Sequence, residues 1–172
     1  HLIKASKNKN SGFYLNELYK LQAVILENEK KQIKTLLIGV SFALLDFAEA
    51  FPMDLKYCQV METGGMKGRR KEITRNELHD YLKKQWQLPK IISEYGMTEL
   101  LSQAYAKKDG IFYCPPWMKV LIRAQDDPLE TLTVSDNATR GALNIIDLAN
   151  IYSCAFIATE DVGLLQPDGG FE

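Results

Sequence analysis

The sequence predicts an α/β fold, with parallel βαβ units in the first part and largely antiparallel strands in the second. Two observations support this prediction. Up to about residue 93, short apolar runs that end in glycine turns alternate with amphipathic segments of helical length. Beyond that point, strand-like segments follow one another without a helix between them, which favours antiparallel pairing. We therefore expect a three-layer α/β architecture.

Length and composition indicate one folded unit. The 172 residues suffice for a single domain with a hydrophobic core, and we expect one domain over residues 1–172. The 21 basic and 22 acidic residues nearly balance, so no strong field favours nucleic acid or an anionic membrane. No apolar run approaches the roughly 20 residues of a membrane-spanning helix, and the N-terminus lacks signal-peptide features. The expected location is cytoplasmic.

The first part of the chain alternates between helical and extended patterns. Thr74 and Glu77 have the spacing of a capping box, which predicts a helix start. Pro52 and Pro89 mark helix ends. In chain order we expect a loop or the frayed lead-in to a helix over 1–10, a helix over 11–31, a strand over 35–40, a helix over 42–51, a strand over 57–61, a helix from 74 to about 85, and a strand over 91–93.

The later part of the chain is strand-rich. In order we expect a short helix over 100–106, a surface turn over 107–110, a strand over 117–123, a hairpin partner or edge over 131–134, a polar turn over 136–141, strands over 142–148 and 153–158, and an acidic turn over 158–163. In the earlier βαβ units, parallel strands share one carboxyl edge. The glycines that follow them, Gly39, Gly64, Gly65 and Gly96, should therefore lie together where open α/β sheets bind ligands.

One short stretch combines groups suited to a nucleotide. Tyr95-Gly96-Met97-Thr98-Glu99 resembles the tyrosine-glycine-x-threonine-glutamate motif of adenylate-forming enzymes, a superfamily that includes acyl-CoA synthetases. The resemblance implies that Tyr95 packs on adenine and Thr98 contacts the α-phosphate of ATP. It also implies that Glu99 binds magnesium, for which a hard oxygen ligand is suitable. Gly96 would let the main chain approach a phosphate.

Two further stretches match companions of this motif. Thr63-Gly64-Gly65-Met66 is similar to the glycine turn that lines adenine in the superfamily. Thr159-Glu160-Asp161 is similar to its serine/threonine-glycine-aspartate turn, whose aspartate binds the ribose hydroxyls. Glu160 replaces the usual glycine, and Asp161 retains the carboxylate. The resemblance thus implies catalytic roles for Thr98 and Glu99, and nucleotide contacts for Tyr95, Gly96, Asp161 and the Thr63–Met66 turn.

A narrower resemblance covers roughly residues 36–172. Met61–Gly68, Ser93–Gln103 and Asp147–Asn150 are similar to the acyl-protein synthetase family, the fatty-acid-activating subunit of the bacterial bioluminescence fatty-acid reductase. This implies that a long-chain fatty acid or another carboxylic acid reacts with ATP to give acyl-adenylate. A cysteine thiol of an acceptor protein, such as a reductase subunit, then takes the acyl group.

Parts of such an enzyme have no counterpart in these residues. The phosphate loop of the superfamily precedes the matched region, and the lysine-bearing C-terminal domain and acyl-accepting cysteine would follow Glu172. We therefore expect a central fragment that is inactive alone, because the missing positive groups stabilise the phosphates. The three cysteines, Cys58, Cys114 and Cys154, are best interpreted as reduced thiols without a role. Neither histidine has a partner at catalytic spacing.

Structural interpretations remain open for each site residue. Tyr95 could be a packed ring, Glu99 a helix cap, Gly64-Gly65 a plain turn, and Asp161 a turn former. The basic cluster Lys67, Arg69, Arg70 and Lys71 is better explained as a solvated loop than as a phosphate contact. A non-catalytic nucleotide- or acyl-binding module is the main alternative function. A dinucleotide-binding oxidoreductase is disfavoured, because no strand-GxGxxG-helix unit is present.

Overall fold

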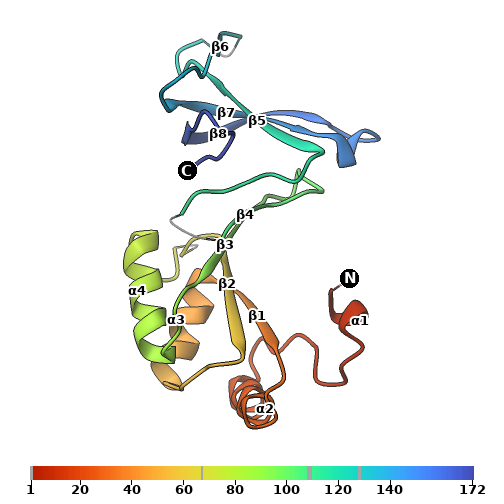
Figure 1. The fold of residues 1–172 in the computed structure, drawn as a ribbon, viewed down its shortest axis with the longest axis vertical. Helices are drawn as coiled ribbons and strands as arrows, with labels where there is room; N and C mark the ends of the chain where they lie inside the picture. Colours follow the sequence, from red (N-terminus) through yellow and green to blue (C-terminus); the bar gives the residue numbers. More distant parts are fainter. Residues whose placement is uncertain (1, 67, 108–109, 128) are drawn as a thin grey trace.

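The computed structural model describes residues 2–66, 68–107, 110–127 and 129–172. Within them the strands form two four-stranded sheets, one at each end of the molecule, with the helices beside the first sheet (Figure 1). In chain order the elements are α1 (Leu2–Ser6), α2 (Leu18–Lys30), β1 (Thr35–Val40), α3 (Ser41–Ala50), β2 (Cys58–Thr63), α4 (Arg75–Trp86), β3 (Ile92–Tyr95), β4 (Ala104–Ala106), β5 (Met118–Arg123), β6 (Thr131–Leu132), β7 (Thr139–Asp147), the 3-10 helix η1 (Leu148–Asn150) and β8 (Phe156–Leu165).

The first sheet has the strand order β1-β2-β3-β4. β1, β2 and β3 are parallel neighbours, while β4 pairs antiparallel with β3. Helices α3 and α4 make the two crossovers, because parallel neighbours require a long connection between their ends. The predicted βαβ units are confirmed. The pairs Val40↔Thr63 and Thr63↔Glu94 place the carboxyl ends of the three parallel strands at one edge.

The core of this half lies between the sheet and helices α3 and α4. Phe47, Val60, Leu82 and Trp86 are almost completely buried there. Trp86 also donates its indole N–H to the carbonyl of Phe51 at 3.0 Å, so its one polar atom is satisfied. Burial of each large side chain contributes about 1.5–3 kcal/mol. This packing fixes α4 against the sheet.

The local signals for α4 act as the sequence predicts. The side chain of Thr74 accepts a hydrogen bond from the Glu77 amide at 3.2 Å. In return, the Glu77 carboxylate accepts from the Thr74 amide at 2.7 Å, which completes the capping box. The helix ends at Trp86, and the next residue, Gln87, adopts a left-handed conformation with φ 52°. Both ends of α4 are therefore set locally.

The second sheet has the order β6-β5-β7-β8 and is antiparallel throughout. This confirms the predicted change of pairing in the second half of the chain. Its core is a separate cluster that includes Val120, Ile122, Leu143, Ile145 and Phe171. A β-bulge interrupts the β7–β8 ladder between Ala142 and Asn144. The mixed α/β class, parallel first and antiparallel later, is therefore as predicted.

Three local predictions are wrong at the N-terminal side and the middle of the chain. Residues 2–6 form a separate helix, α1, rather than a loop or the lead-in to the next helix, and α2 begins at Leu18 instead of residue 11. The predicted helix over 100–106 is replaced by β4. Ala104 and Ala106 are buried against β3, with Ala106 opposite Ser93. Pairing with β3 at the edge of the sheet outweighs the helical preference of alanine, which is a weak local factor.

The predicted acidic turn over 158–163 is also wrong, since these residues lie inside β8. The polar turn over 136–141 likewise gives way at Thr139 to β7. Thr159 faces inward and donates its hydroxyl to the Leu143 carbonyl at 3.0 Å. Glu160 and Asp161 remain exposed. One face of this antiparallel pair is solvated, so a polar run fits the strand.

The basic cluster is partly accounted for by surface contacts. The Arg70 guanidinium pairs with Glu49 at 2.6 Å and with Asp46 at 2.5 Å, both on α3. Arg69 lies over the ring of Phe42. Lys67 and two residues of the predicted turn over 107–110 are outside the described residues. Among the described helices, none combines the length and apolar character needed to span a membrane.

Candidate active site

The carboxyl edge of the first sheet holds two of the predicted segments. Thr63 ends β2 and Tyr95 ends β3. The Thr63 hydroxyl donates to the Glu94 carboxylate at 3.2 Å and links the two strands at this edge. Gly39 differs from the prediction, because it lies within β1 opposite Glu62 and is not in a turn. The edge therefore combines the glycine turn after β2 with the tyrosine motif after β3.

The glycine turn begins with a residue that suits its backbone. Gly64 has φ +69°, which other residues rarely adopt. Its carbonyl accepts a hydrogen bond from the hydroxyl of Ser41, the first residue of α3. Gly64 and Gly65 are exposed, and the space around Gly65 is open. Met66 is almost completely buried, with 2% of its surface exposed, so the turn presents Gly64 and Gly65 to solvent.

A buried polar cluster lies next to this turn and is connected to it through Ser41. Its centre is Glu62, whose side chain is 7% exposed. The Glu62 carboxylate lies 3.2 Å from the Ser41 hydroxyl, whose one proton it shares with the Gly64 carbonyl, and 3.7 Å from His79 Nε2. Arg75 Nε lies at 3.7 Å from the same carboxylate, and Ser93 Oγ lies 3.2 Å from His79 Nε2. Strands β2 and β3 and helices α3 and α4 thus meet at one ionised group.

The cluster is arranged for support rather than for nucleophilic catalysis. Ser93 and Glu62 both face Nε2 of His79, whereas a catalytic triad uses both ring nitrogens. Ser93 is completely buried. Burial raises the pKa of Glu62, but the neighbouring polar groups of His79 and Ser93 and the positive charge of Arg75 lower it below its usual range. Glu62 is therefore held as a carboxylate.

The spacing of residues in the sequence does not predict this cluster, because His79 has no partner at catalytic spacing. The available signal was the alternation in β2. Cys58 and Val60 are buried, and Glu62 continues the same inward-facing series. A carboxylate at an inward position requires buried polar partners. His79, the polar residue beside Leu78 on the capped helix, is a candidate partner for Glu62.

The tyrosine motif leaves the first sheet next to the second. The Tyr95 ring makes edge contacts with Phe171, at a centroid distance of 5.2 Å, and with Phe112, at 6.0 Å. A side chain at Gly96 would meet Gln103 at 3.1 Å, so the main chain runs close to that residue. Thr98 and Glu99 are exposed on the following turn. The motif therefore offers solvent a hydroxyl and a carboxylate beside a half-buried ring.

The structure brings Tyr95 and Asp161 together from the two sheets. The Tyr95 hydroxyl donates to Asp161 Oδ2 at 2.7 Å, across 66 positions of sequence. Burial raises the pKa of Tyr95 above its usual range, and the bond to Asp161 raises it further. Asp161 itself is exposed in β8, where its amide donates to the Thr159 hydroxyl at 3.2 Å. Tyr95 thus donates to Asp161 and remains protonated.

The residues present fit magnesium only as an ion that arrives with phosphates. Among the described residues, no group of three or more histidine, cysteine, aspartate or glutamate side chains could enclose a metal ion. Glu99 supplies one exposed carboxylate on the turn after β3. Magnesium commonly takes one or two protein carboxylates together with substrate phosphates and water. A single glutamate is compatible with that mode of binding.

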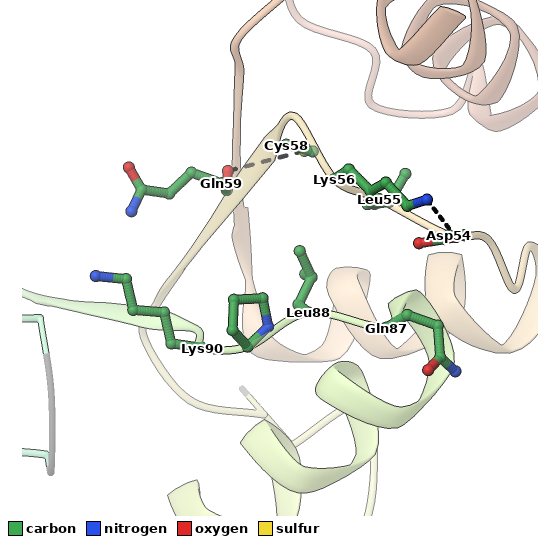
Figure 2. A pocket seen from close by; sticks show the side chains of 9 residues that line it. Asp54, Leu55, Lys56, Cys58, Gln59, Gln87, Leu88 and Lys90 are labelled. Atoms are coloured by element: carbon green, nitrogen blue, oxygen red, sulfur yellow. Dashed lines mark hydrogen bonds and ion pairs between the residues drawn. The ribbon is translucent and has the colours of Figure 1, made fainter. Parts of the chain in front are cut away.

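A shallow hollow lies at the opposite edge of the first sheet. It has a volume of about 390 Å³ and is lined by the segments that lead into β2 and β3, including Lys56, Gln59 and Lys90 (Figure 2). Cys58 also lines it, but this thiol is buried, and burial raises its pKa to about 12. The thiol is therefore protonated at neutral pH and a poor nucleophile. The hollow contains none of the predicted site residues.

Comparison with known proteins gave matches among solved structures, whereas no family model and no curated protein sequence matches the chain. ATP-bound MatB from Rhodopseudomonas palustris superposes with a TM-score of 0.61 and 12% identity, over 88% of this chain and 32% of MatB. O-succinylbenzoate coenzyme A synthetase from Bacillus subtilis, in complex with AMP, gives 0.57 and 17%, over 88% and 33%. A benzoate CoA ligase from Burkholderia xenovorans gives 0.53 and 16%, over 90% and 33%.

These matches define the class of fold. Two of these neighbours are a coenzyme A synthetase and a CoA ligase, and the chain has the fold of one part of such an enzyme. It spans about a third of their length, 32–33% of each chain. The B. subtilis enzyme has also been solved with ATP and a magnesium ion. At identities of 12–17%, these matches show the fold of the chain.

Proposed function

We propose that this chain is the nucleotide-binding part of an adenylate-forming acid–thiol ligase, within the large domain of a longer enzyme. The observation that carries the proposal is the position of the Tyr95–Glu99 motif, which begins at the carboxyl end of β3 with Tyr95 bonded to Asp161 at 2.7 Å. The motif and the fold are independent observations, because the fold comparison depends on backbone shape. Both lead to the same class of enzyme.

The residue roles are those that the resemblance to adenylate-forming enzymes implies. Thr63, Gly64, Gly65 and Met66 form the turn that lines adenine together with the Tyr95 ring, while Gly96 admits a phosphate. Thr98 donates its hydroxyl to the α-phosphate, and Asp161 accepts from the ribose hydroxyls. Glu99 holds magnesium, which when bound neutralises charge on the phosphates. These groups bind and orient ATP, while the groups that neutralise the remaining phosphate charge come from elsewhere in the longer enzyme.

The substrate and acceptor are proposed from the narrower sequence resemblance. We take the acid to be a long-chain fatty acid, whose carboxylate oxygen attacks the α-phosphorus as pyrophosphate leaves. A cysteine thiolate of an acceptor protein then attacks the acyl carbon and AMP leaves, which makes the enzyme a cytoplasmic acyl-protein synthetase. The acceptor is not Cys58, because that thiol is buried and its pKa is raised to about 12.

Pyrophosphate exchange tests the activity. The full-length protein should exchange labelled pyrophosphate into ATP only when a fatty acid is present. The Glu99→Gln variant removes the magnesium carboxylate and should reduce the exchange by at least a hundredfold, as expected for loss of a major electrostatic contact in the transition state. The matched control is Glu72→Gln, an exposed glutamate before α4, which should retain the wild-type rate.

Each outcome of this experiment has a distinct meaning. Exchange that persists in Glu99→Gln would remove the magnesium assignment. Binding of ATP without exchange by the wild-type protein would indicate a non-catalytic nucleotide-binding module. The acceptor is tested separately by adding labelled fatty acid and ATP and then treating the protein with hydroxylamine, which cleaves thioesters. Label that is found only on coenzyme A would replace the protein acceptor with a small thiol.

A further inference from the structure

A second buried carboxylate lies next to the Thr98–Glu99 turn. Asp147 is the last residue of β7 and has no exposed surface. Its Oδ2 accepts from the amides of Leu101 at 2.9 Å and Ser102 at 2.8 Å. Its Oδ1 accepts from the Ser102 hydroxyl at 2.7 Å and the Ala149 amide at 3.1 Å. Each carboxylate oxygen of Asp147 thus accepts two hydrogen bonds.

A neighbouring amide fixes the other side of the same turn. Asn150, in η1, donates from Nδ2 to the main-chain carbonyl of Glu99 at 2.8 Å. The same nitrogen donates to the Cys154 carbonyl at 3.0 Å. Leu100, which lies between Glu99 and Leu101 in the sequence, is buried in the core of the second sheet. The main chain from Glu99 to Ser102 is therefore attached to the second sheet on both sides of Leu100.

Asp147 accepts more hydrogen bonds than it needs to cap the 3-10 helix that follows it. One of its four donors, the Ala149 amide, belongs to the 3-10 helix that it begins. The other three come from a segment 45 or 46 positions earlier in the chain. Burial raises the pKa of Asp147, but the hydrogen bonds from Ser102, Leu101 and Ala149 lower it below its usual range. The carboxylate is therefore charged, and its charge is met by hydrogen-bond donors.

The arrangement separates what holds the turn from what the turn presents. Within the described residues, no hydrogen bond or ion pair engages the Glu99 carboxylate, while the Glu99 main chain is held by Asn150. Tyr95, four residues earlier, belongs to the first sheet, and Asp161 belongs to the second. The position of the Glu99 carboxylate relative to these two residues therefore depends on the attachment of its turn.

We infer that Asp147, together with Asn150, is a positioning residue that sets where Glu99 holds the magnesium ion of bound ATP. The inference rests on the proposed function, because it takes Glu99 as the magnesium ligand. Neither Asp147 nor Asn150 touches the ligand. Their effect reaches it through the main chain of residues 99–102. The consequence is a selective one, since loosening the turn affects the magnesium contact more than the adenine contacts.

Two variants of the full-length protein test this inference. Asp147→Asn replaces one acceptor oxygen by an NH₂ group, which cannot accept a hydrogen bond. Each oxygen of Asp147 accepts from two donors, so the variant loses at least one hydrogen bond whichever oxygen is replaced. Asn150→Ala removes the contact to Glu99 without leaving a buried charge, so it serves if the first variant does not fold. Trp86→Phe is the control, because it loses a buried hydrogen bond in the other core.

The measurement is the affinity for ATP by calorimetry, with and without magnesium. In the wild-type protein, magnesium should strengthen binding. In Asp147→Asn and Asn150→Ala, we expect this gain to decrease at least fivefold while ATP binding without magnesium stays within twofold. Trp86→Phe should lower the melting temperature and leave the gain unchanged. Wild-type gains in both site variants would overturn the inference, as would an absence of any magnesium effect in the wild-type protein.

Pyrophosphate exchange on the same samples distinguishes the inference from the proposed function. If the wild-type protein binds magnesium-ATP but does not exchange pyrophosphate, the proposed catalysis is wrong, and the calorimetry still decides on the positioning role. If exchange occurs and depends on Glu99, but the magnesium gain is normal in both site variants, the positioning role alone is wrong. In the expected case, both variants also need more magnesium for half-maximal exchange.

Discussion

Replacement of Tyr95 by phenylalanine should lower stability and raise the affinity for ATP. The substitution keeps the ring that packs against Phe171 and removes the hydroxyl that donates to Asp161 at 2.7 Å. In the proposed site, the ribose hydroxyls require the same carboxylate. Nucleotide binding must therefore displace the Tyr95 hydroxyl from Asp161, and the variant no longer has to break this bond.

The structure sets the size of both effects. A hydrogen bond to a charged acceptor contributes about 1.5–3 kcal/mol when it is buried. Asp161 is exposed, which reduces the contribution to about 1 kcal/mol because water solvates the free carboxylate. We therefore expect the free energy of unfolding to decrease by about 1 kcal/mol. The same energy corresponds to a gain in ATP affinity of up to about fivefold.

Urea unfolding and ATP titration measure the two effects. Tyr113→Phe is a matched control, since Tyr113 donates to Asp168 at 2.9 Å in the same half of the molecule. It should lose a similar amount of stability and keep the wild-type ATP affinity. An affinity that falls in Tyr95→Phe would refute the reasoning, because it would show that the hydroxyl contacts the nucleotide. Unchanged affinity would show that Asp161 and ribose do not compete with Tyr95.

The remaining predictions concern the buried cluster at Glu62. Ser41→Ala removes the donor to the Gly64 carbonyl and should cost about 1 kcal/mol of stability and weaken ATP binding, whereas Ser6→Ala, at an exposed hydroxyl, should do neither. The pKa of Glu62 is lowered on folding, so its stabilising contribution is complete above the unfolded pKa of about 4.3 and is lost as the pH falls through the lower folded pKa. Urea midpoints between about pH 6 and pH 3 should decrease less in Glu62→Gln than in the wild-type protein; an identical decrease would show that Glu62 is not responsible.

Much of the first half of the chain was predictable because its signals are local. The capping box at Thr74 and Glu77 forms within one turn of helix, so it can be recognised without tertiary information. The alternation of strand and helix patterns predicts parallel pairing, because a helical crossover returns the chain in the same direction. The same argument predicts a strand over 91–93, which in the structure runs from Ile92 to Tyr95. These features depend on neighbours in sequence.

The second half was predicted in class but not in detail. Pairing decides whether Ala104–Ala106 is strand or helix, and its partner residues 93–95 are separated from it by the turn of the motif. Thr159 to Asp161 were expected in a turn because polar residues favour turns. In the sheet they form a strand with one solvated face, since Thr159 turns inward to the Leu143 carbonyl. Such contacts have no signal within a short window of sequence.

The sequence alone determined the α/β class, the order of the parallel units and the residues that could bind a nucleotide. Only the tertiary structure decided which of these residues meet and what holds them. Tyr95 donates a hydrogen bond to Asp161. Glu62 contacts Ser41 and His79 next to the Gly64 turn. Asp147 accepts from the main chain just after Glu99. The reason is physical: residue type sets what a side chain can bind, while contacts between residues 17 to 66 positions apart depend on how the sheets and helices pack.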